Sequence, residues 1–183
     1  THVKLNTNVE YFIVNAAECE PLIETDKYLC RTFADRIIRT IPQIAEAIGA
    51  SKKVIALKGA YEKEIAALKV EIFELGYFYP AGDEQTLIQQ VTGRCVPERG
   101  LPSDVGCVVD NVGTVLNIAD ALEGKVVTEK YLSVVGEVEH PIQLRVPIGT
   151  PVLECVKAAH PIVSDFALIM GGPMMGKQLT EQA

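Results

Sequence analysis

The sequence predicts an α/β protein with a mainly parallel sheet at its core, followed by a small α+β module. Four short apolar runs, near residues 11, 54, 71 and 107, are separated by segments in which apolar residues recur at helical spacing. Helices between consecutive strands favour a parallel sheet that is covered on both faces. After Gly124 the pattern changes to two strand-like stretches joined by a turn, and a short helix follows them.

Composition restricts the classes of protein to which the chain can belong. Its 183 residues, 48% of them hydrophobic, are enough to bury a sizeable core. The net charge is −7 and Lys and Arg form no run, so we expect no nucleic-acid partner. No apolar stretch approaches the ~18 residues of a membrane span, so we expect no direct insertion into a membrane.

The cysteines indicate a reducing compartment. There are five, and none forms a C-x-x-C pair, so the chain carries no recognisable zinc or iron–sulfur motif. Reduced thiols in a cytoplasmic protein are the simplest interpretation. The chain begins at Thr1 without a methionine, and we expect it to be part of a longer protein.

The strand at residues 11–14 is the element around which the rest is organised. It is a run of aromatic and β-branched residues that stops abruptly at Asn15. Glu18 and Glu20 follow, at the position where open α/β sheets keep their ligands. The alternative is that these two acids only begin a loop and cap the next helix.

Periodicity and turn residues predict the remaining core elements. Pro42 is expected in the first turn of a helix that ends at Gly49. In chain order we expect helices at 25–38 and 43–48, a strand at 53–57, a helix at 61–68, a strand at 70–75, a helix at 85–91, a loop at 92–106, a strand at 107–109 and a helix at 115–122.

Polar residues also follow the third and fourth strands. They form two groups, Gly82, Asp83 and Glu84 before one helix, and Asp110, Asn111 and Thr114 before the next. Ordinary capping of a helix start is the alternative explanation for the acids. Because parallel strands end at one edge of a sheet, we expect both groups to line one cleft together with Asn15, Glu18 and Glu20.

Beyond Gly124 we expect a hairpin-like pair of strands at 126–138 and 142–146. Thr150 is predicted to cap a helix at 152–159, with Pro151 in its first position. A further strand at 166–170 runs into the sequence GGPMMG, which predicts a flexible and polarisable loop.

Five short motifs occur in a fixed order along the chain. They are THVKL at 1–5, NAAECEP at 15–21, YPAGDE at 79–84, DNVGT at 110–114 and GGPMMG at 171–176. On these motifs the chain resembles the RnfC family of electron-transport proteins and, more distantly, the flavin- and NADH-binding subunit of respiratory complex I. Soluble members, a cobalamin reductase and an electron-transfer protein linked to proline reductase, share them. The resemblance covers essentially the whole chain.

The resemblance implies a division into domains. Residues 1–124 would form a Rossmann-like domain of the FMN- and NADH-binding type, and 125–163 an SLBB module of β-grasp type. Residues 164–183 would hold a last strand and the GGPMMG segment. The family's Gly-rich phosphate loop precedes THVKL and its ferredoxin-like cysteine motifs follow GGPMMG, so we expect both to lie outside this chain.

The resemblance also implies roles for particular residues. Those assigned to the flavin and the nicotinamide are Lys4, Asn15, Glu18, Glu20, Tyr79, Gly82, Asp83, Glu84, Asp110, Asn111 and Thr114. The cofactors carry the hydride and electron chemistry, and the protein supplies orientation and local charge. No catalytic side chain and no metal ligand is predicted among these residues.

Two functions remain open from the sequence. The first is part of an electron-transfer flavoprotein subunit that passes electrons between NADH, or another donor, and 4Fe–4S clusters through FMN. In that case the complete protein would bind FMN, NAD(H) and 4Fe–4S clusters and would join partner subunits. It would lie at the inner face of a membrane or free in the cytoplasm. This portion alone would bind none of these cofactors. The second is a non-catalytic docking or ligand-binding module within a redox complex.

Overall fold

The computed structural model describes residues 9–68 and 72–179. It forms two compact units, which we describe separately. The sheet unit comprises Thr1–Ala17 and Leu29–Val126, and the hairpin unit comprises Glu18–Tyr28 and Val127–Ala183. Among the described residues, none of the helices has the length and apolar character that crossing a membrane requires.

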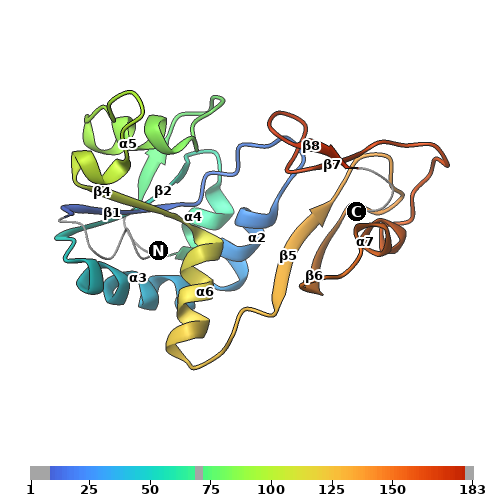
Figure 1. Cartoon of the computed structure of the whole chain (residues 1–183), viewed down its shortest axis with the longest axis horizontal. Coiled ribbons are helices and arrows are strands. Elements are labelled where there is room, and N and C mark those ends of the chain that lie inside the picture. The colour runs from blue at the N-terminus through green and yellow to red at the C-terminus, as the bar shows by residue number, and fades with distance from the viewer. Residues whose placement is uncertain (1–8, 69–71, 180–183) are drawn as a thin grey trace. The chain divides into compact units, whose positions relative to one another are not determined.

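The sheet unit is built on a four-stranded parallel sheet (Figure 1). Its strands are β1 (Tyr11–Asn15), β2 (Lys52–Lys58), β3 (Phe73–Leu75) and β4 (Cys107–Asn111). They lie in the order β3-β2-β1-β4, so the chain winds from β1 in one direction to β3 and then places β4 on the other side of β1. The predicted parallel sheet is confirmed.

Helices cover both faces of this sheet, with α5 on one face and α3 and α6 on the other (Figure 1). The helical elements are α3 (Ala34–Ile48), α4 (Glu62–Leu68), α5 (Glu84–Thr92), the 3-10 turn η1 (Pro102–Val105), α6 (Val112–Leu122) and the second half of α2 (Thr25–Thr32), whose first four residues belong to the hairpin unit. Successive strand residues point to opposite faces. Ile13 therefore joins Leu87 and Ile88 of α5 in one core cluster, while its fully buried neighbours Phe12 and Val14 point to the opposite face.

The second and third helical segments differ from the prediction. The chain breaks between α2 and α3 at Phe33, and α3 then continues through Pro42 instead of starting there. Pro42 is exposed, and its missing N–H removes only one bond from the helical ladder. The apolar stripe of α3 stabilises the whole helix because it is buried along its length, at Ile37, Ile41, Ile44 and Ile48. Gly49 ends the helix as predicted, in the left-handed conformation.

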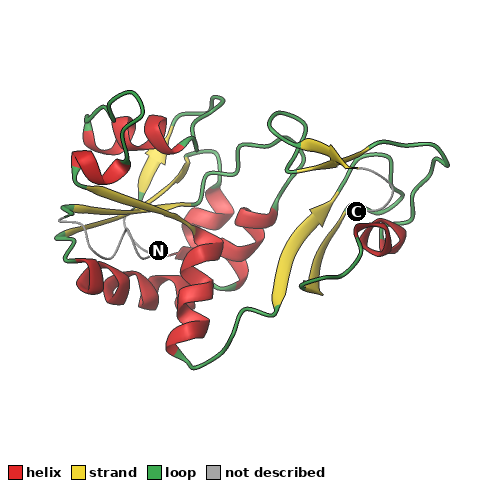
Figure 2. Cartoon of the chain, viewed as in Figure 1, coloured by secondary structure: helices red, strands yellow, loops and turns green. Residues whose placement is uncertain are grey.

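The hairpin unit contains the predicted antiparallel pair (Figure 2). Its elements are β5 (Glu129–Val134), β6 (Ile142–Pro147), α7 (Val152–Ala158), β7 (Leu168–Met170) and β8 (Lys177–Leu179). The strand β8, which the sequence did not predict, pairs antiparallel with β7 across the GGPMMG loop.

The predicted cap of α7 is wrong. The residue at the N-cap position is Pro151, whose side chain accepts no hydrogen bond. The hydroxyl of Thr150 donates instead to the carbonyl of Pro147, at 2.8 Å. Thr150 lies one residue before the cap, so its side chain closes the turn after β6 and leaves the helix start uncapped.

The buried face of α5 provides a test of this packing. Replacing Leu87, which is fully buried, by Ala should lower the free energy of unfolding of the sheet unit by about 3 kcal/mol, because the shorter side chain leaves a cavity. Leu122 at the end of α6 is 58% exposed, and the same replacement there should cost less than about 0.5 kcal/mol. Urea unfolding followed by circular dichroism measures both, and equal effects would contradict the arrangement described.

Candidate functional site

The chain adds β2 and β3 on one side of β1 and then β4 on the other side, so the sheet has a switch point between β1 and β4. The candidate ligand site lies at this switch point. In open α/β sheets the ligand crevice lies beyond the carboxyl ends of the strands on either side of such a point. Asn15 ends β1 and Asn111 ends β4, and the two residues are direct partners in the parallel register. Two polar residues 96 positions apart in the sequence, 111 − 15, are therefore neighbours at this edge.

A third segment is joined to this edge by the side chain of Asn15. Its Nδ2 donates to the carbonyl of Gly82 at 2.8 Å, and its Oδ1 accepts from the N–H of Ala17 at 3.0 Å. The carboxamide is therefore used on both sides, and it fixes the loop before α5 against the end of β1. The structure thus brings together Asn15, Gly82 and Asn111, one from each predicted group.

Two helices begin beside these residues. The Asp83 carboxylate caps α5 by accepting from the N–H of Thr86 at 3.0 Å, and the Asn111 side chain caps α6 by accepting from the N–H of Gly113 at 2.7 Å. These caps explain why α5 and α6 begin one and three residues earlier than predicted. The capping alternative is confirmed for Asp83, and Asn111 serves α6 in the same way.

The other predicted residues of the sheet unit differ in exposure. Glu84 and Asp83 are exposed, Tyr79 is 43% exposed, and Asp110 and Thr114 are partly buried near the start of α6. The exposure of the two acids agrees with the cleft hypothesis, which requires acids that are not buried. Lys4 lies outside the described residues.

A cation that was not among the predicted site residues also lies at the carboxyl edge. Lys58 is the last residue of β2 and is only 7% exposed, and its Nζ lies 5.4 Å from the ring centre of Tyr77. A lysine at the end of a buried strand could have been noticed, because charged residues rarely end such a strand unless they meet a partner or a ligand. Lys58 therefore belongs in the candidate site.

Glu18 and Glu20 belong to the hairpin unit, although they were expected in the first domain. Burial raises the pKa of Glu18 from its ordinary value of 4.5 to about 7, and the nearby Asp26 carboxylate adds to this shift. The N–H of Asp26, which donates to Glu18 at 3.2 Å, opposes it. Glu18 is therefore a carboxyl group that titrates near neutral pH.

Glu20 is held by the GGPMMG loop. Its carboxylate accepts from the backbone N–H of Met174 at 2.8 Å and from that of Met175 at 2.9 Å. Gly172 comes so close that a side chain there would overlap the Glu20 carboxylate. The sequence predicted a flexible loop. In the structure this loop is hydrogen-bonded to the Glu20 carboxylate, which lies 154 residues before Met174 in the chain.

A parallel sheet whose strand order reverses at a switch point, with polar side chains and helix starts at the carboxyl ends of its strands, defines a class, the open doubly wound α/β proteins. The comparison with protein families gives the particular family within this class. Residues 1–120 match the Nuo51 FMN-binding domain, and the chain belongs to this family.

Curated relatives match over nearly the whole chain. The chain is 45% identical to the cobalamin reductase PduS of Citrobacter freundii, over 98% of this chain and 42% of that protein. It is 32% identical to a subunit of the Na⁺-translocating ferredoxin:NAD⁺ oxidoreductase complex of Acetobacterium woodii, over 96% of this chain and 43% of the relative. The chain therefore spans less than half of the length of these relatives.

Solved structures support the fold. An NAD⁺-reducing [NiFe]-hydrogenase in the H₂-reduced state superposes with a TM-score of 0.76 over 88% of this chain and 35% of that one, at 23% identity. The air-oxidised form gives a TM-score of 0.70 over 92% of this chain and 35% of that chain. The predicted α/β fold and the predicted relationship to RnfC-type proteins are both confirmed.

The titration of Glu18 predicts how stability depends on pH. Its pKa is raised in the folded protein, so between about pH 4.5 and 7 the unfolded chain releases a proton that the folded chain retains. Stability should fall as the pH rises through this window and level off above it. Glu18→Gln, which is neutral at every pH, should remove the fall and leave the variant more stable than the native protein at pH 8 by on the order of 2 kcal/mol.

Urea unfolding at a series of pH values measures this dependence. Glu46→Gln, at an exposed carboxylate on α3, is the control and should leave the slope unchanged. An unaltered slope in Glu18→Gln would show that the Glu18 carboxyl group titrates alike in both states.

The contact between Gly172 and Glu20 can be tested by a pair of glycine substitutions. Gly172 and Gly136 have φ angles of +93° and +105°, so Ala at either position carries similar backbone strain. Nothing lies near Gly136, whereas a methyl group at position 172 would push against a carboxylate that two N–H groups hold in place. Gly172→Ala should therefore cost about 1–3 kcal/mol more than Gly136→Ala. Adding Glu20→Ala should remove most of that difference in a double-mutant cycle.

Proposed function

We propose that the complete protein transfers electrons between NAD(H) and a further redox partner through FMN, and that the sheet unit supplies part of the flavin and nicotinamide site. The observation that carries this proposal is the pairing of Asn15 with Asn111 at the switch point of a domain whose family is described as FMN-binding. Because the chain spans less than half of its curated relatives, the activity of the whole protein is inferred.

The residues at the carboxyl edge fit the neutral and hydroxyl-bearing parts of these cofactors. The exposed carboxylate of Glu84 can accept hydrogen bonds from ribose hydroxyls or from a carboxamide, and Thr114 offers a hydroxyl group. The phenol ring of Tyr79, partly exposed, offers an apolar surface on which a planar ring can pack. When bound, FMN would accept a hydride and pass electrons on singly.

The phosphate groups need a different environment. Asp83, Glu84 and Asp110 place carboxylates at this edge, and carboxylates repel a phosphate. The N-terminal ends of α5 and α6 and the ammonium group of Lys58 supply positive charge. We propose that these groups assist a Gly-rich loop and Lys4, which the resemblance places before and at the start of this chain.

The names of the relatives support the electron-transfer role. A cobalamin reductase, a ferredoxin:NAD⁺ oxidoreductase complex and an NAD⁺-reducing hydrogenase are all redox systems, and two of the three names include NAD⁺.

We propose that 4Fe–4S clusters outside these residues connect the flavin to the partner. In the described part of the chain, no group of three His, Cys, Asp or Glu side chains could hold a metal ion. Partner subunits would then place the protein at a membrane surface or in the cytoplasm.

We propose that the sheet unit corresponds to the Rossmann-like domain and the hairpin unit to the SLBB module. The assignment of Glu18 and Glu20 to the cofactors stays a prediction that rests on the resemblance. Their surroundings in the hairpin unit support a structural role for Glu20, whose carboxylate holds the GGPMMG loop.

The test uses the complete protein with its cofactors. Glu84→Gln keeps the shape of the side chain but weakens the hydrogen bonds that a carboxylate accepts, which contribute about 1.5–3 kcal/mol each. The rate of flavin reduction by NADH should fall about tenfold or more, while the unfolding temperature should change little. Glu46→Gln, at an exposed acid on α3, is the matched control and should leave the rate unchanged. If both variants reduce flavin at the native rate, the docking function becomes the better explanation.

A further inference from the structure

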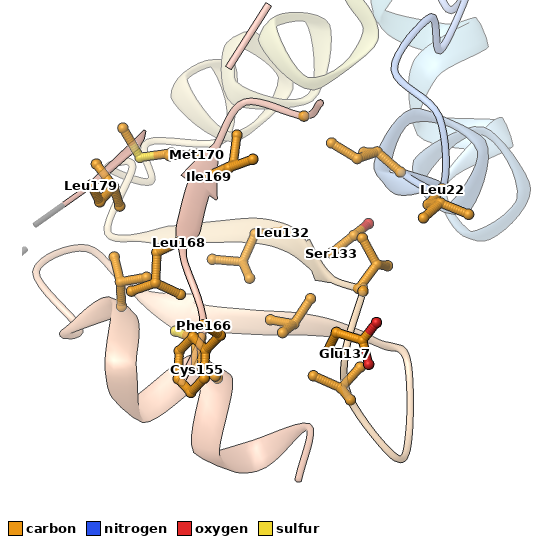
Figure 3. A pocket seen from close by; sticks show the side chains of 18 of the residues that line it. Leu22, Leu132, Ser133, Glu137, Cys155, Phe166, Leu168, Ile169, Met170 and Leu179 are labelled. Carbon is orange, nitrogen blue, oxygen red and sulfur yellow. The ribbon is translucent and has the colours of Figure 1, made fainter. Parts of the chain in front are cut away.

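The hairpin unit contains a pocket that the flavin site does not use. It has a volume of about 730 Å³ and is lined by residues of β5, α7 and the segment that leads into β7 (Figure 3). Small-molecule sites in proteins typically measure about 300–1,000 Å³ and have mostly apolar walls with a few polar groups. The volume of this pocket therefore suits one small organic molecule.

The walls of the pocket are apolar. Leu132 of β5, Leu168 of β7 and Phe166 before it face the same space, and Cys155 of α7 closes one side (Figure 3). The pocket is open enough that Phe166 is still 38% exposed. Covering these side chains would be favourable by roughly 25 cal/mol for each Å² removed from water.

One end of the pocket is polar, but its hydroxyl groups bond to one another. Ser133 and Thr25 lie 2.9 Å apart, oxygen to oxygen, and Ser133 donates to the Oε1 of Gln143 at 2.8 Å. Ser133 also accepts from the N–H of Glu24 at 3.3 Å. In the part of the chain that is described, the only buried side-chain polar atom without a partner is the Nε2 of Gln143, beside this cluster. A ligand would therefore find few free hydrogen-bonding groups.

The charge of the lining excludes one class of ligand. Glu137 and Asp165 are the charged residues among those that line the pocket, and the described lining contains no Lys, Arg or His. Two carboxylates without a cation repel an anion. FMN and NAD(H), which carry phosphates, do not suit this pocket.

From these observations we propose that the hairpin unit binds a mostly apolar small molecule that carries no anionic group. The site is separate from the proposed flavin site in both residues and ligand chemistry, so either proposal can fail without the other. The occupant that the walls favour is uncharged or cationic, is large enough to fill most of the pocket and has few hydrogen-bonding groups.

The test uses Nile red, a neutral apolar dye whose emission rises in apolar surroundings, added to the complete protein. We expect saturable binding of one dye per chain. Leu168→Trp should weaken it at least tenfold because the larger ring occupies the pocket. Ile148→Trp is the matched control, at a residue of the same unit that is 57% exposed and outside the lining, and it should bind as the native protein does.

A second variant covers the case in which Leu168→Trp fails to fold. Ala167 lines the pocket and is exposed, so Ala167→Trp should be tolerated and should also weaken dye binding.

The anionic dye 8-anilinonaphthalene-1-sulfonate should bind at least tenfold more weakly than Nile red, and bound flavin should remain at the native level in every variant. Native affinity for Nile red in both Trp variants, or equal affinity for the two dyes, would overturn the proposal. Non-saturable dye binding would do the same and would favour a protein-docking surface.

Discussion

The position of β1 between two parallel neighbours is the constraint on which the sheet unit depends. Phe12, Ile13 and Val14 are fully buried, and the strand pairs with β2 on one side and β4 on the other. A shift of one residue would exchange the side chains of the two faces, so the register is strongly fixed. With the register fixed, Asn15 must end beside Asn111, and the polar edge follows from the packing of the apolar strand.

The polar groups at this edge already make hydrogen bonds that stabilise the fold. Asn15 holds the loop at Gly82, while Asp83 and Asn111 cap helices, so their side chains already have partners. A ligand that took these partners would have to replace the hydrogen bonds that it broke. Glu84 is exposed in the first turn of α5 and takes no part in these capping contacts.

The two units offer different chemistry to ligands. The carboxyl edge of the sheet combines helix starts, a buried lysine and exposed acids, an arrangement that suits a polar cofactor with several hydrogen-bonding groups. The pocket of the hairpin unit has apolar walls and two carboxylates, and its hydroxyls are bonded to one another. Under the two proposals, the sheet unit would hold the cofactor and the hairpin unit would recognise a second, apolar molecule.

Most of the elements, and the family, could be predicted from the residues alone. Buried strands show as short runs of β-branched and aromatic residues, and Gly49 marks a helix end because left-handed backbone favours glycine. The motifs were sufficient for the relationship to RnfC-type proteins, because short segments kept in a fixed order are jointly specific. Polar residues after strands predicted an edge site, and the structure brings Asn15, Gly82 and Asn111 together there.

The contacts of these residues could be known only from the folded chain. The continuity of α3 through Pro42 depends on a buried stripe, and no local signal outweighs the proline. Glu20 is held by amides of the GGPMMG loop, and Lys58 lies buried at the carboxyl edge, because packing brings distant segments together. Local sequence fixes backbone preference within a few residues, whereas hydrogen-bond partners far apart in the chain are chosen by the packing of the whole unit.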